Sequence, residues 1–399
     1  MQPHASQPAQ PASDGRRRFA CVDLAKGIGI VLVVLWHYGP EKLGSDRWWP
    51  DFFSSAAGVV FKFHMPLFMF LSGFLFTWDA ARAAPFWGAY WEHLGKKSLR
   101  LLLPYLSVSL VYVVLKLTAQ RFFAYHPITW ETAWNALVNP LGGPATLLWF
   151  IYCLMIVFAV FPLVQRLVRR DLPLVLLSLG LFFLFVPREK AAELVEPEAG
   201  TWPLLLAAPH WFLVDRFCRF FPLFVCGYLF RKRRLLEGIS PWAGLLGSLA
   251  VFAGVSLLDP RPFLEADAAA ALAGAFAGVL SCLCGAMVLE RVGPLAEGLS
   301  LAGRHSAGVY LMHQPFAWFV AVVLYQKMGI TGPSYLLGLP LALALGLLVP
   351  IAIENFVLSR SNLLSLAFLG VRLKTAVPQP VRKSPPPQPE PTEMARGAS

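Results

Sequence analysis

Three ionisable side chains interrupt the first long apolar stretch of the chain, residues 19–38: they are Asp23, Lys26 and His37. At about 100° per residue, Asp23 and Lys26 lie about 60° apart around a helix, and His37 returns to within about 20° of Lys26. The three side chains therefore share one stripe of the helix, with Lys26 and His37 roughly 16 Å apart along its axis.

An ionised side chain at membrane depth costs at least a few kcal/mol, so such residues usually face a protein interior and mark a function. On this basis the stripe is the first candidate site of the chain. The alternative interpretation is that Asp23 and Lys26 only pair near one membrane surface, while His37 is an ordinary polar tip at the other. The spacing by itself leaves both interpretations open.

A second polar set lies in the next apolar run, residues 54–77. His64 and Ser72 are eight positions apart, which is about 80° of rotation, so both are expected to border one groove. Pro66 is expected near the middle of this helix, where it would bend the helix and free carbonyl groups that line a cavity. Alternatively, Ser72 and Gly73 form a small-residue notch for helix packing.

Two further groups are candidates for chemistry. Lys97 and Arg100 stand at positions i and i+3 near the start of the third apolar run. The pair could hold the phosphates of a cytoplasmic nucleotide-like cofactor, or it could be only a topology signal that contacts lipid headgroups. His313 follows Tyr310 by three residues and lies well inside a later apolar segment, so it is another intramembrane ionisable group.

The elements that position these groups follow from composition. Hydrophobic residues make up 57% of the 399 residues and charged residues only 14%, whereas an ordinary soluble domain is about a quarter charged. The chain is therefore predicted to be a polytopic membrane protein. Its net charge of +11 does not indicate nucleic acid as a partner, because the basic residues cluster in short loops between apolar runs. The six cysteines predict neither a disulfide framework nor a metal site.

About ten apolar runs are long enough, or nearly long enough, to span a membrane. They cover residues 19–38, 54–77, 98–117, 146–165, 172–187, 217–230, 241–258, 268–289, 306–326 and 334–356. With residues 1–18 in the cytoplasm, the alternating loops place the basic clusters on the cytoplasmic side and many acidic residues on the other side. The predicted fold is an all-α integral membrane protein of the inner or plasma membrane: a bundle of about ten transmembrane helices with both termini cytoplasmic.

One folded domain is expected between two tails. Residues 1–18 are rich in Pro, Gln and Ser, and residues 358–399 form a Pro-rich cytoplasmic extension, so both are expected to be disordered. Residues 19–357 form the transmembrane domain. Within it, a Phe-rich, Pro-containing motif followed by Gly recurs at residues 63–76 and 220–230. The Pro-to-Gly spacings differ by two, so this internal echo does not predict a structural repeat.

Five motifs in chain order resemble the membrane-bound acyltransferase 3 family, in its polysaccharide O-acetyltransferase (fucose 4-O-acetylase-like) branch. The first is Lys26, ten intervening residues and His37, where the family usually has Arg instead of Lys. The others are residues 63–76, Lys97-x-x-Arg100 before Pro104-Tyr105, Leu148-Trp149-Phe150, and Tyr310-Leu311-Met312-His313-Gln314-Pro315. The resemblance covers roughly residues 18–350. The lysine departs from the family pattern and offers no guanidinium fork at that position.

The resemblance implies transfer of an acyl group, usually acetyl from acetyl-CoA, to a hydroxyl of a cell-surface glycan or lipid-linked sugar. It implies that His37 is the catalytic residue and that Lys26 helps to engage the acyl donor. Imidazole can take the proton of a sugar hydroxyl near neutral pH, or accept the acyl group itself. Asp23 would balance the charge of Lys26. Because Lys26 is predicted on the cytoplasmic side and His37 on the outer side, we expect a donor passage between them.

The same resemblance extends the set of candidate residues. Lys97 and Arg100 are candidates for donor binding, and four side chains are candidates for substrate contact or for support of the site: His64, Ser72, Trp149 and His313. The expected partners are acyl-CoA, the glycan or sugar acceptor and membrane lipids, with no metal ion.

Two other functions compete with acyl transfer. A transporter or flippase of a lipid-linked glycan could use Asp23, Lys26 and His37 as a proton relay. A structural or sensory membrane protein could recruit partners through the Pro-rich tail. The order of the motifs favours the acyltransferase, but the sequence leaves open the acceptor, the choice between acetyl and succinyl or another acyl group, the role of His37 as base or acyl carrier, and the oligomeric state.

Overall fold

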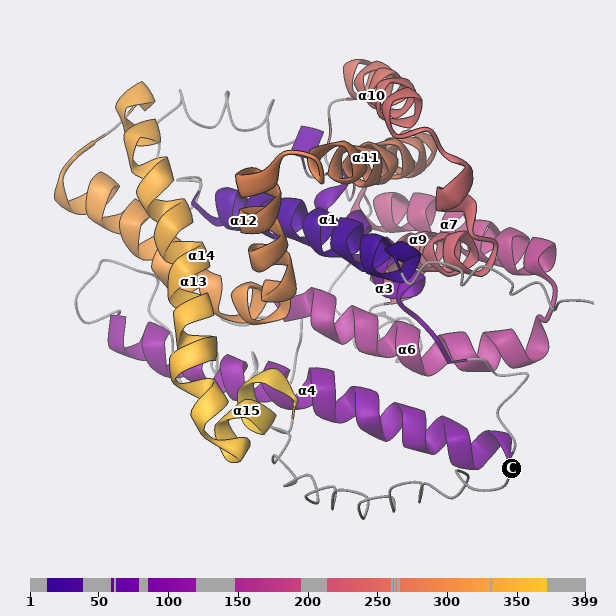
Figure 1. The fold of residues 1–399 in the computed structure, drawn as a ribbon, viewed down its shortest axis with the longest axis horizontal. Helices are drawn as coiled ribbons and strands as arrows, with labels where there is room; N and C mark the ends of the chain where they lie inside the picture. The colour runs from indigo at the N-terminus through magenta and orange to yellow at the C-terminus, as the bar shows by residue number, and fades with distance from the viewer. Residues whose placement is uncertain are drawn as a thin grey trace, which may run out of the picture.

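The structure is a computed structural model. It describes residues 13–38, 59–60, 62–78, 85–119, 148–194, 214–259, 261, 263, 266–330 and 332–371. Within these residues the chain is helical and contains no strand. Helix α1 (Ser13–His37) lies in the middle of the bundle, where it contacts α3, α11, α12, α13 and α14 (Figure 1). The helix that carries the candidate stripe is therefore surrounded by protein.

The described helices follow the predicted order of apolar runs. They are α3 (His64–Phe74), α4 (Phe86–Ala119), α6 (Trp149–Leu167), α7 (Asp171–Leu194), α9 (Val214–Lys232), α10 (Pro241–Leu258), α11 (Ala268–Leu289), α12 (Gly293–Arg304), α13 (Ser306–Val322), α14 (Leu339–Phe356) and α15 (Asn362–Leu369). Short 3₁₀ or π turns are η3 (Leu235–Gly238), η4 (Val323–Lys327), η5 (Gly332–Gly338) and η6 (Leu358–Arg360). Each predicted run overlaps at least one helix, so the prediction of an all-α fold is confirmed.

Seven helical segments among the described residues are long and apolar enough to cross a membrane. They are Ala20–His37, Phe86–Thr118, Trp149–Leu167, Pro241–Leu258, Ala268–Leu289, Ser306–Tyr325 and Gly332–Arg360. The apolar helices His64–Phe74 and Asp171–Leu184 are shorter, and α9 carries charged residues at both ends. The segments suit a helical membrane protein, whereas ten spans and the cytoplasmic position of both termini stay predictions.

The second predicted span differs most from expectation. Because α3 begins at His64, Pro66 lies in its first turn, where a missing backbone N–H breaks no helical hydrogen bond. The prediction that Pro66 bends the middle of a long helix is therefore wrong.

The two halves of the internal echo, on α3 and α9, pack against each other. A Cβ atom on Gly73 would lie 2.0 Å from the carbonyl oxygen of Phe224, and one on Gly227 would lie 2.0 Å from the carbonyl oxygen of Phe70. Each glycine thus lets the backbone of the other helix approach closely. The two similar motifs therefore form the two sides of one contact between α3 and α9.

The C-terminal tail begins later than predicted. After α14, η6 and α15 continue the fold, and α15 packs on α4. The side chain of Ser361 accepts a hydrogen bond from the backbone N–H of Leu364, and Gly370, at φ 65°, ends the helix. At the other end, α1 begins at Ser13, inside the expected N-terminal tail. The remaining residues of both tails lie outside the described residues.

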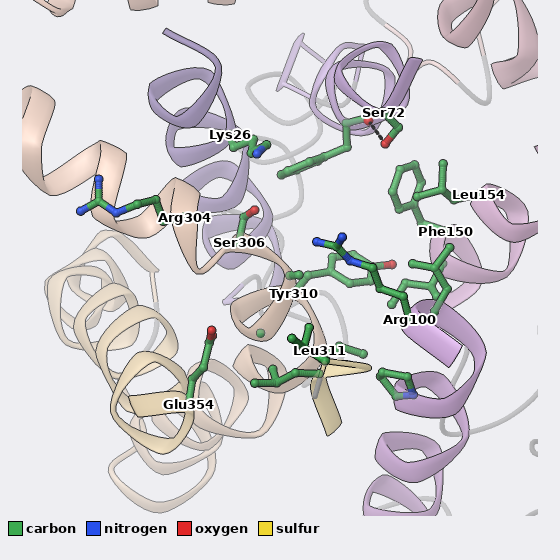
Figure 2. Close-up of a pocket in the computed structure, with 18 of the residues that line it drawn as sticks. Lys26, Ser72, Arg100, Phe150, Leu154, Arg304, Ser306, Tyr310, Leu311 and Glu354 are labelled. Carbon is green, nitrogen blue, oxygen red and sulfur yellow. Dashed lines mark hydrogen bonds between the residues drawn. The ribbon is translucent and has the colours of Figure 1, made fainter. Parts of the chain in front are cut away.

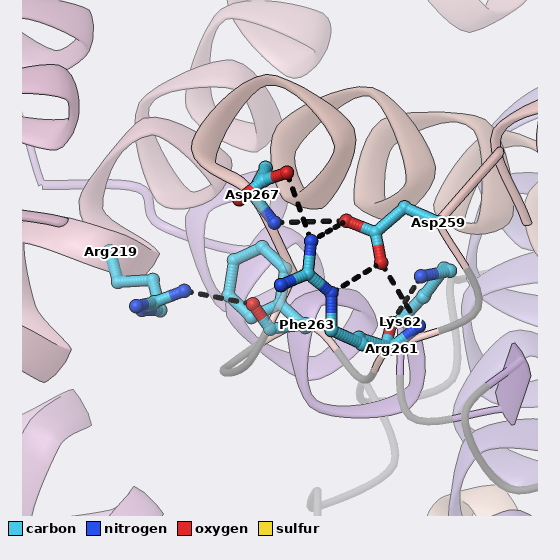
Figure 3. A network of polar contacts seen from close by, with 6 residues as sticks. All are labelled: Lys62, Arg219, Asp259, Arg261, Phe263 and Asp267. Carbon is cyan, nitrogen blue, oxygen red and sulfur yellow. Dashed lines mark hydrogen bonds and ion pairs between the residues drawn. The ribbon is translucent and has the colours of Figure 1, made fainter. Parts of the chain in front are cut away.

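A polar network holds the segment between α10 and α11 (Figure 3). Asp259 accepts two hydrogen bonds of 2.8 Å from the guanidinium of Arg261, and others from the backbone N–H groups of Arg261 and Asp267. These hydrogen bonds, led by those from the Arg261 side chain, hold the pKa of the Asp259 carboxyl well below its usual range. Asp259, Arg261 and Asp267 therefore form a hydrogen-bonded cap between the end of α10 and the start of α11.

Two buried cationic side chains donate hydrogen bonds to the segment between α10 and α11. Lys62 donates a hydrogen bond to the backbone carbonyl of Arg261, and Arg219 on α9 donates one of 2.8 Å to the carbonyl of Phe263. Both side chains are fully buried, and burial lowers the pKa of Lys62. The segment between α10 and α11 is therefore hydrogen-bonded to α9 and to the residue two positions before α3.

We expect this network to make stability depend on pH. The pKa of Asp259 is lower in the folded protein than its ordinary value of 3.8, so its contribution is complete above about pH 5 and is lost as pH falls through 3.8 toward the folded pKa. The melting temperature, measured by differential scanning fluorimetry in detergent between pH 7 and pH 3, should fall less steeply for Asp259→Asn than for the unmodified protein. If the melting temperatures of the two proteins fall equally steeply with pH, Asp259 is not the source of this pH dependence.

Candidate functional site

Helices α1 and α13 bring two histidines into contact. Nε2 of His313 lies 3.1 Å from Nδ1 of His37, and the two rings cross at 70° with their centroids 4.7 Å apart. Nδ1 of His37 also lies 2.7 Å from the carbonyl oxygen of Val33. His313 is 2% exposed, and its Nδ1 lies 2.9 Å and 3.0 Å from the carbonyl oxygens of Val309 and Tyr310. The two imidazoles form one hydrogen-bonded unit inside the bundle.

At the other end of the stripe, Nζ of Lys26 pairs with Oδ1 of Asp23 at 3.2 Å. The two side chains are 24% and 28% exposed. Their i, i+3 spacing on α1 brings them together within one turn. The pair thus has the geometry expected if Asp23 balances the charge of Lys26.

Lys26 lines a cavity of about 610 Å³. Three other predicted site residues share its wall: Ser72 on α3, and Lys97 and Arg100 on α4. Figure 2 shows the side chains of Lys26 and Arg100 directed into the same open space from opposite sides. Nζ of Lys97 lies 4.0 Å from the ring centroid of Phe158. Cations that are far apart in the sequence therefore surround one cavity.

The cavity wall also contains polar residues that were not predicted as site residues. They include Arg304, Ser306, Tyr310 and Glu354. In Figure 2 the carboxylate of Glu354 points in from α14, whereas the guanidinium of Arg304 is turned away from that of Arg100. Oε2 of Glu354 lies 3.1 Å from Nδ1 of His305. A lone carboxylate at the end of an apolar run is the signal that would have identified Glu354.

The histidine pair adjoins the cavity but does not line it. Tyr310 lines the cavity, and its ring centroid is 6.4 Å from that of His313. Phe150, also on the wall, has its ring centroid 6.1 Å from that of Tyr310. His37 is not among the residues that line this cavity, so the expected passage from Lys26 to His37 stays a prediction. Tyr310 joins the two regions, because it lines the cavity and its ring contacts that of His313.

His64 and Trp149 also lie away from the cavity wall. His64 is the first residue of α3 and is 5% exposed. Ser72 lines the cavity and His64 does not, so a groove bordered by both stays a prediction. Trp149 opens α6, where the guanidinium of Arg216 lies 5.3 Å from its ring centroid. Its neighbour Phe150 reaches the cavity in its place.

Helix α12, which the sequence analysis did not predict, fixes the position of the Asp23–Lys26 pair. It crosses α1 so closely that a Cβ atom on Gly303 would lie 1.7 Å from the carbonyl oxygen of Asp23 (Figure 1). A Cβ atom on Gly27 would lie 1.9 Å from the carbonyl oxygen of Leu299. The two backbones therefore touch beside Lys26 through a pair of glycines.

We expect Gly303→Ala to destabilise the protein, because the added methyl group forces α12 away from α1. Overpacking of this kind typically costs about 1–3 kcal/mol. Gly298→Ala is the matched control on the same helix, since nothing lies within 4 Å of a Cβ atom there. The control should be neutral or slightly stabilising. Thermal unfolding of the purified variants measures the difference, and equal melting temperatures would contradict the close contact.

Comparison with known proteins identifies the family of this chain. A family model described as an acyltransferase domain matches residues 19–354. The chain belongs to the acyltransferase 3 family. The matched region contains the Asp23–Lys26 pair, both histidines and the cations of the cavity. The resemblance inferred from the sequence is thus confirmed.

One curated relative of the chain is the nodulation protein NolL of Mesorhizobium japonicum (strain LMG 29417 / CECT 9101 / MAFF 303099). The two are 34% identical over 99 residues. This stretch is 24% of each chain, so the chain matches about a quarter of the length of the relative. No solved structure matches the chain significantly.

Proposed function

We propose that this protein is an O-acyltransferase that moves an acyl group, most simply acetyl, from acyl-CoA to a hydroxyl of a cell-surface glycan or lipid-linked sugar. Family membership supports the class of reaction. The observation that carries the finer proposal is the cavity, in which three cations gather beside a hydrogen-bonded pair of histidines. The cations can bind the phosphates of a donor, and a histidine nearby can act as a base. Together they suit transfer of an acyl group from a phosphorylated donor.

The cavity suits acyl-CoA in charge and in size. Lys26, Lys97 and Arg100 offer charge-assisted hydrogen bonds to phosphate oxygens. Apolar side chains such as Phe68 and Leu154 cover other parts of the wall, where a pantetheine chain can lie. A volume of about 610 Å³ is within the range of small-molecule sites.

His37 acts as the proton acceptor in this proposal. The acceptor hydroxyl gives its proton to the imidazole while its oxygen attacks the thioester carbonyl carbon. The tetrahedral intermediate then collapses, the carbon–sulfur bond breaks, and the CoA thiolate leaves with the proton from His37. Tyr310 lines the cavity and its ring contacts that of His313, so in this proposal a movement of its side chain opens the way for the thioester to reach the histidines.

The proposed topology assigns the two substrates to opposite sides of the membrane. The span Ala20–His37 has Lys26 near one end and His37 at the other. The basic segment before this span favours a cytoplasmic N-terminus, so Lys26 meets cytoplasmic acyl-CoA. His37 then meets an acceptor that approaches from the outer side.

The proposal is tested with the purified protein in nanodiscs and acetyl-CoA labelled in the acetyl group. Glycolipid and glycan fractions of membranes that lack the protein serve as acceptors. We expect label to enter one fraction together with release of free CoA, and succinyl-CoA and longer donors tested in parallel define the acyl preference. A transporter would consume no acyl-CoA, so the absence of CoA release with every donor and fraction would contradict the proposal.

A further inference from the structure

We propose that His313 is a positioning residue that fixes the proton on Nδ1 of His37 and so makes Nε2 of His37 the basic nitrogen. This inference rests on the proposed function of His37. It follows from the hydrogen-bond partners of the two imidazole rings.

The partners of His313 determine which of its nitrogens carries hydrogen. Its Nδ1 lies 2.9 Å from the carbonyl oxygen of Val309 and 3.0 Å from that of Tyr310. A carbonyl oxygen only accepts hydrogen bonds, so Nδ1 must be the donor. In the neutral ring the hydrogen is then on Nδ1, and Nε2 presents a lone pair.

That lone pair faces His37. Nδ1 of His37 lies 3.1 Å from Nε2 of His313 and 2.7 Å from the carbonyl oxygen of Val33. Both neighbours are acceptors, so Nδ1 of His37 must carry hydrogen and share it between them. In the opposite tautomer, the lone pair on Nδ1 of His37 would face the lone pairs of His313 Nε2 and of the Val33 carbonyl oxygen. The neutral His37 ring therefore holds its own lone pair on Nε2, the nitrogen away from His313.

The same geometry supports His37 during the reaction. When Nε2 takes a proton from the acceptor hydroxyl, the ring becomes an imidazolium whose Nδ1–H donates more strongly to His313. His313 is 2% exposed, so it supplies an acceptor without bringing a second charge into the bundle. A carboxylate at this position would be a buried anion whenever His37 is neutral. A histidine held by two backbone carbonyls avoids that cost.

Two substitutions of similar size separate this role from packing. His313→Gln keeps an oxygen that can accept from Nδ1 of His37, whereas His313→Leu keeps bulk and removes the acceptor. We expect His313→Leu to lower kcat by about 10-fold to 100-fold with little change in KM for acetyl-CoA, because His313 is not on the cavity wall. His313→Gln should recover most of the lost rate. Met312→Leu, one residue earlier on α13, is the control for packing.

The outcomes are distinguishable. If the unmodified protein transfers no acyl group, the proposed function fails before His313 is examined. If the unmodified protein is active and His313→Leu has the same kcat as the unmodified protein, the positioning role is wrong. Equal losses in His313→Gln and His313→Leu, or a loss that appears only as a lower melting temperature, would likewise overturn it.

Discussion

Acyl transfer by His37→Ala is expected to be slower than that of the unmodified protein by about 100-fold to 10,000-fold, the usual contribution of a positioned general base. A sugar hydroxyl is a poor nucleophile near neutral pH, and the substitution removes the imidazole that is proposed to take its proton. His37 is not on the wall of the cavity, so the KM for acetyl-CoA should change little. Initial rates with labelled acetyl-CoA measure both constants.

The control for this prediction is Leu35→Ala, on the same turn of α1 but about 200° around the helix from His37. It should retain turnover, and both variants should elute as folded protein in size-exclusion chromatography. If His37→Ala keeps its turnover, the histidine is not the base. If acid-quenched protein carries the acyl group on His37, the imidazole acts as a covalent carrier instead of a proton acceptor.

The sequence predicts helices well where an apolar run has clear ends. α10 and α11 occupy residues 241–258 and 268–289, as predicted, because Pro241 opens the first and Asp267 precedes the second. α12 was missed because twelve residues with Gly, Glu and Ser are too short and too polar for a length criterion. Its position comes from tertiary contact, since its glycine pairs with Gly27 across the chain.

The same distinction applies to the site. The Lys26–Asp23 pair is local, so helical spacing alone places the two groups together. The contact between His37 and His313 joins residues 276 positions apart, and no periodicity within one helix can predict it. The sequence marked both histidines as unusual at membrane depth, but their hydrogen bond needed the packing of α13 on α1. Tyr310 belongs to a recognised motif, but its place on the cavity wall beside His313 likewise depends on tertiary packing.

The other large effect is expected from the double variant Lys97→Gln, Arg100→Gln, whose KM for acetyl-CoA should rise by about 100-fold or more. Each cation offers charge-assisted hydrogen bonds to phosphate, and each such bond contributes about 1.5–3 kcal/mol. The reaction of bound donor takes place at His37, so kcat should stay within a few-fold of the unmodified value. Steady-state kinetics with varied acetyl-CoA measure the two constants separately.

Two controls decide between donor binding and a topology signal. Lys96→Gln removes an adjacent charge from the same helix, but Lys96 is exposed, pairs with Glu92 and is not on the cavity wall. If Lys97 and Arg100 bind the donor, the KM of Lys96→Gln should stay unchanged. If the positive charges act only as a topology signal, the loss of Lys96 should cause a similar defect. S-acetylpantetheine is a donor that lacks the phosphates, so the double variant should use it as well as the unmodified protein does. A rise in KM for S-acetylpantetheine equal to that for acetyl-CoA, or an equal defect in Lys96→Gln, would contradict phosphate binding by Lys97 and Arg100.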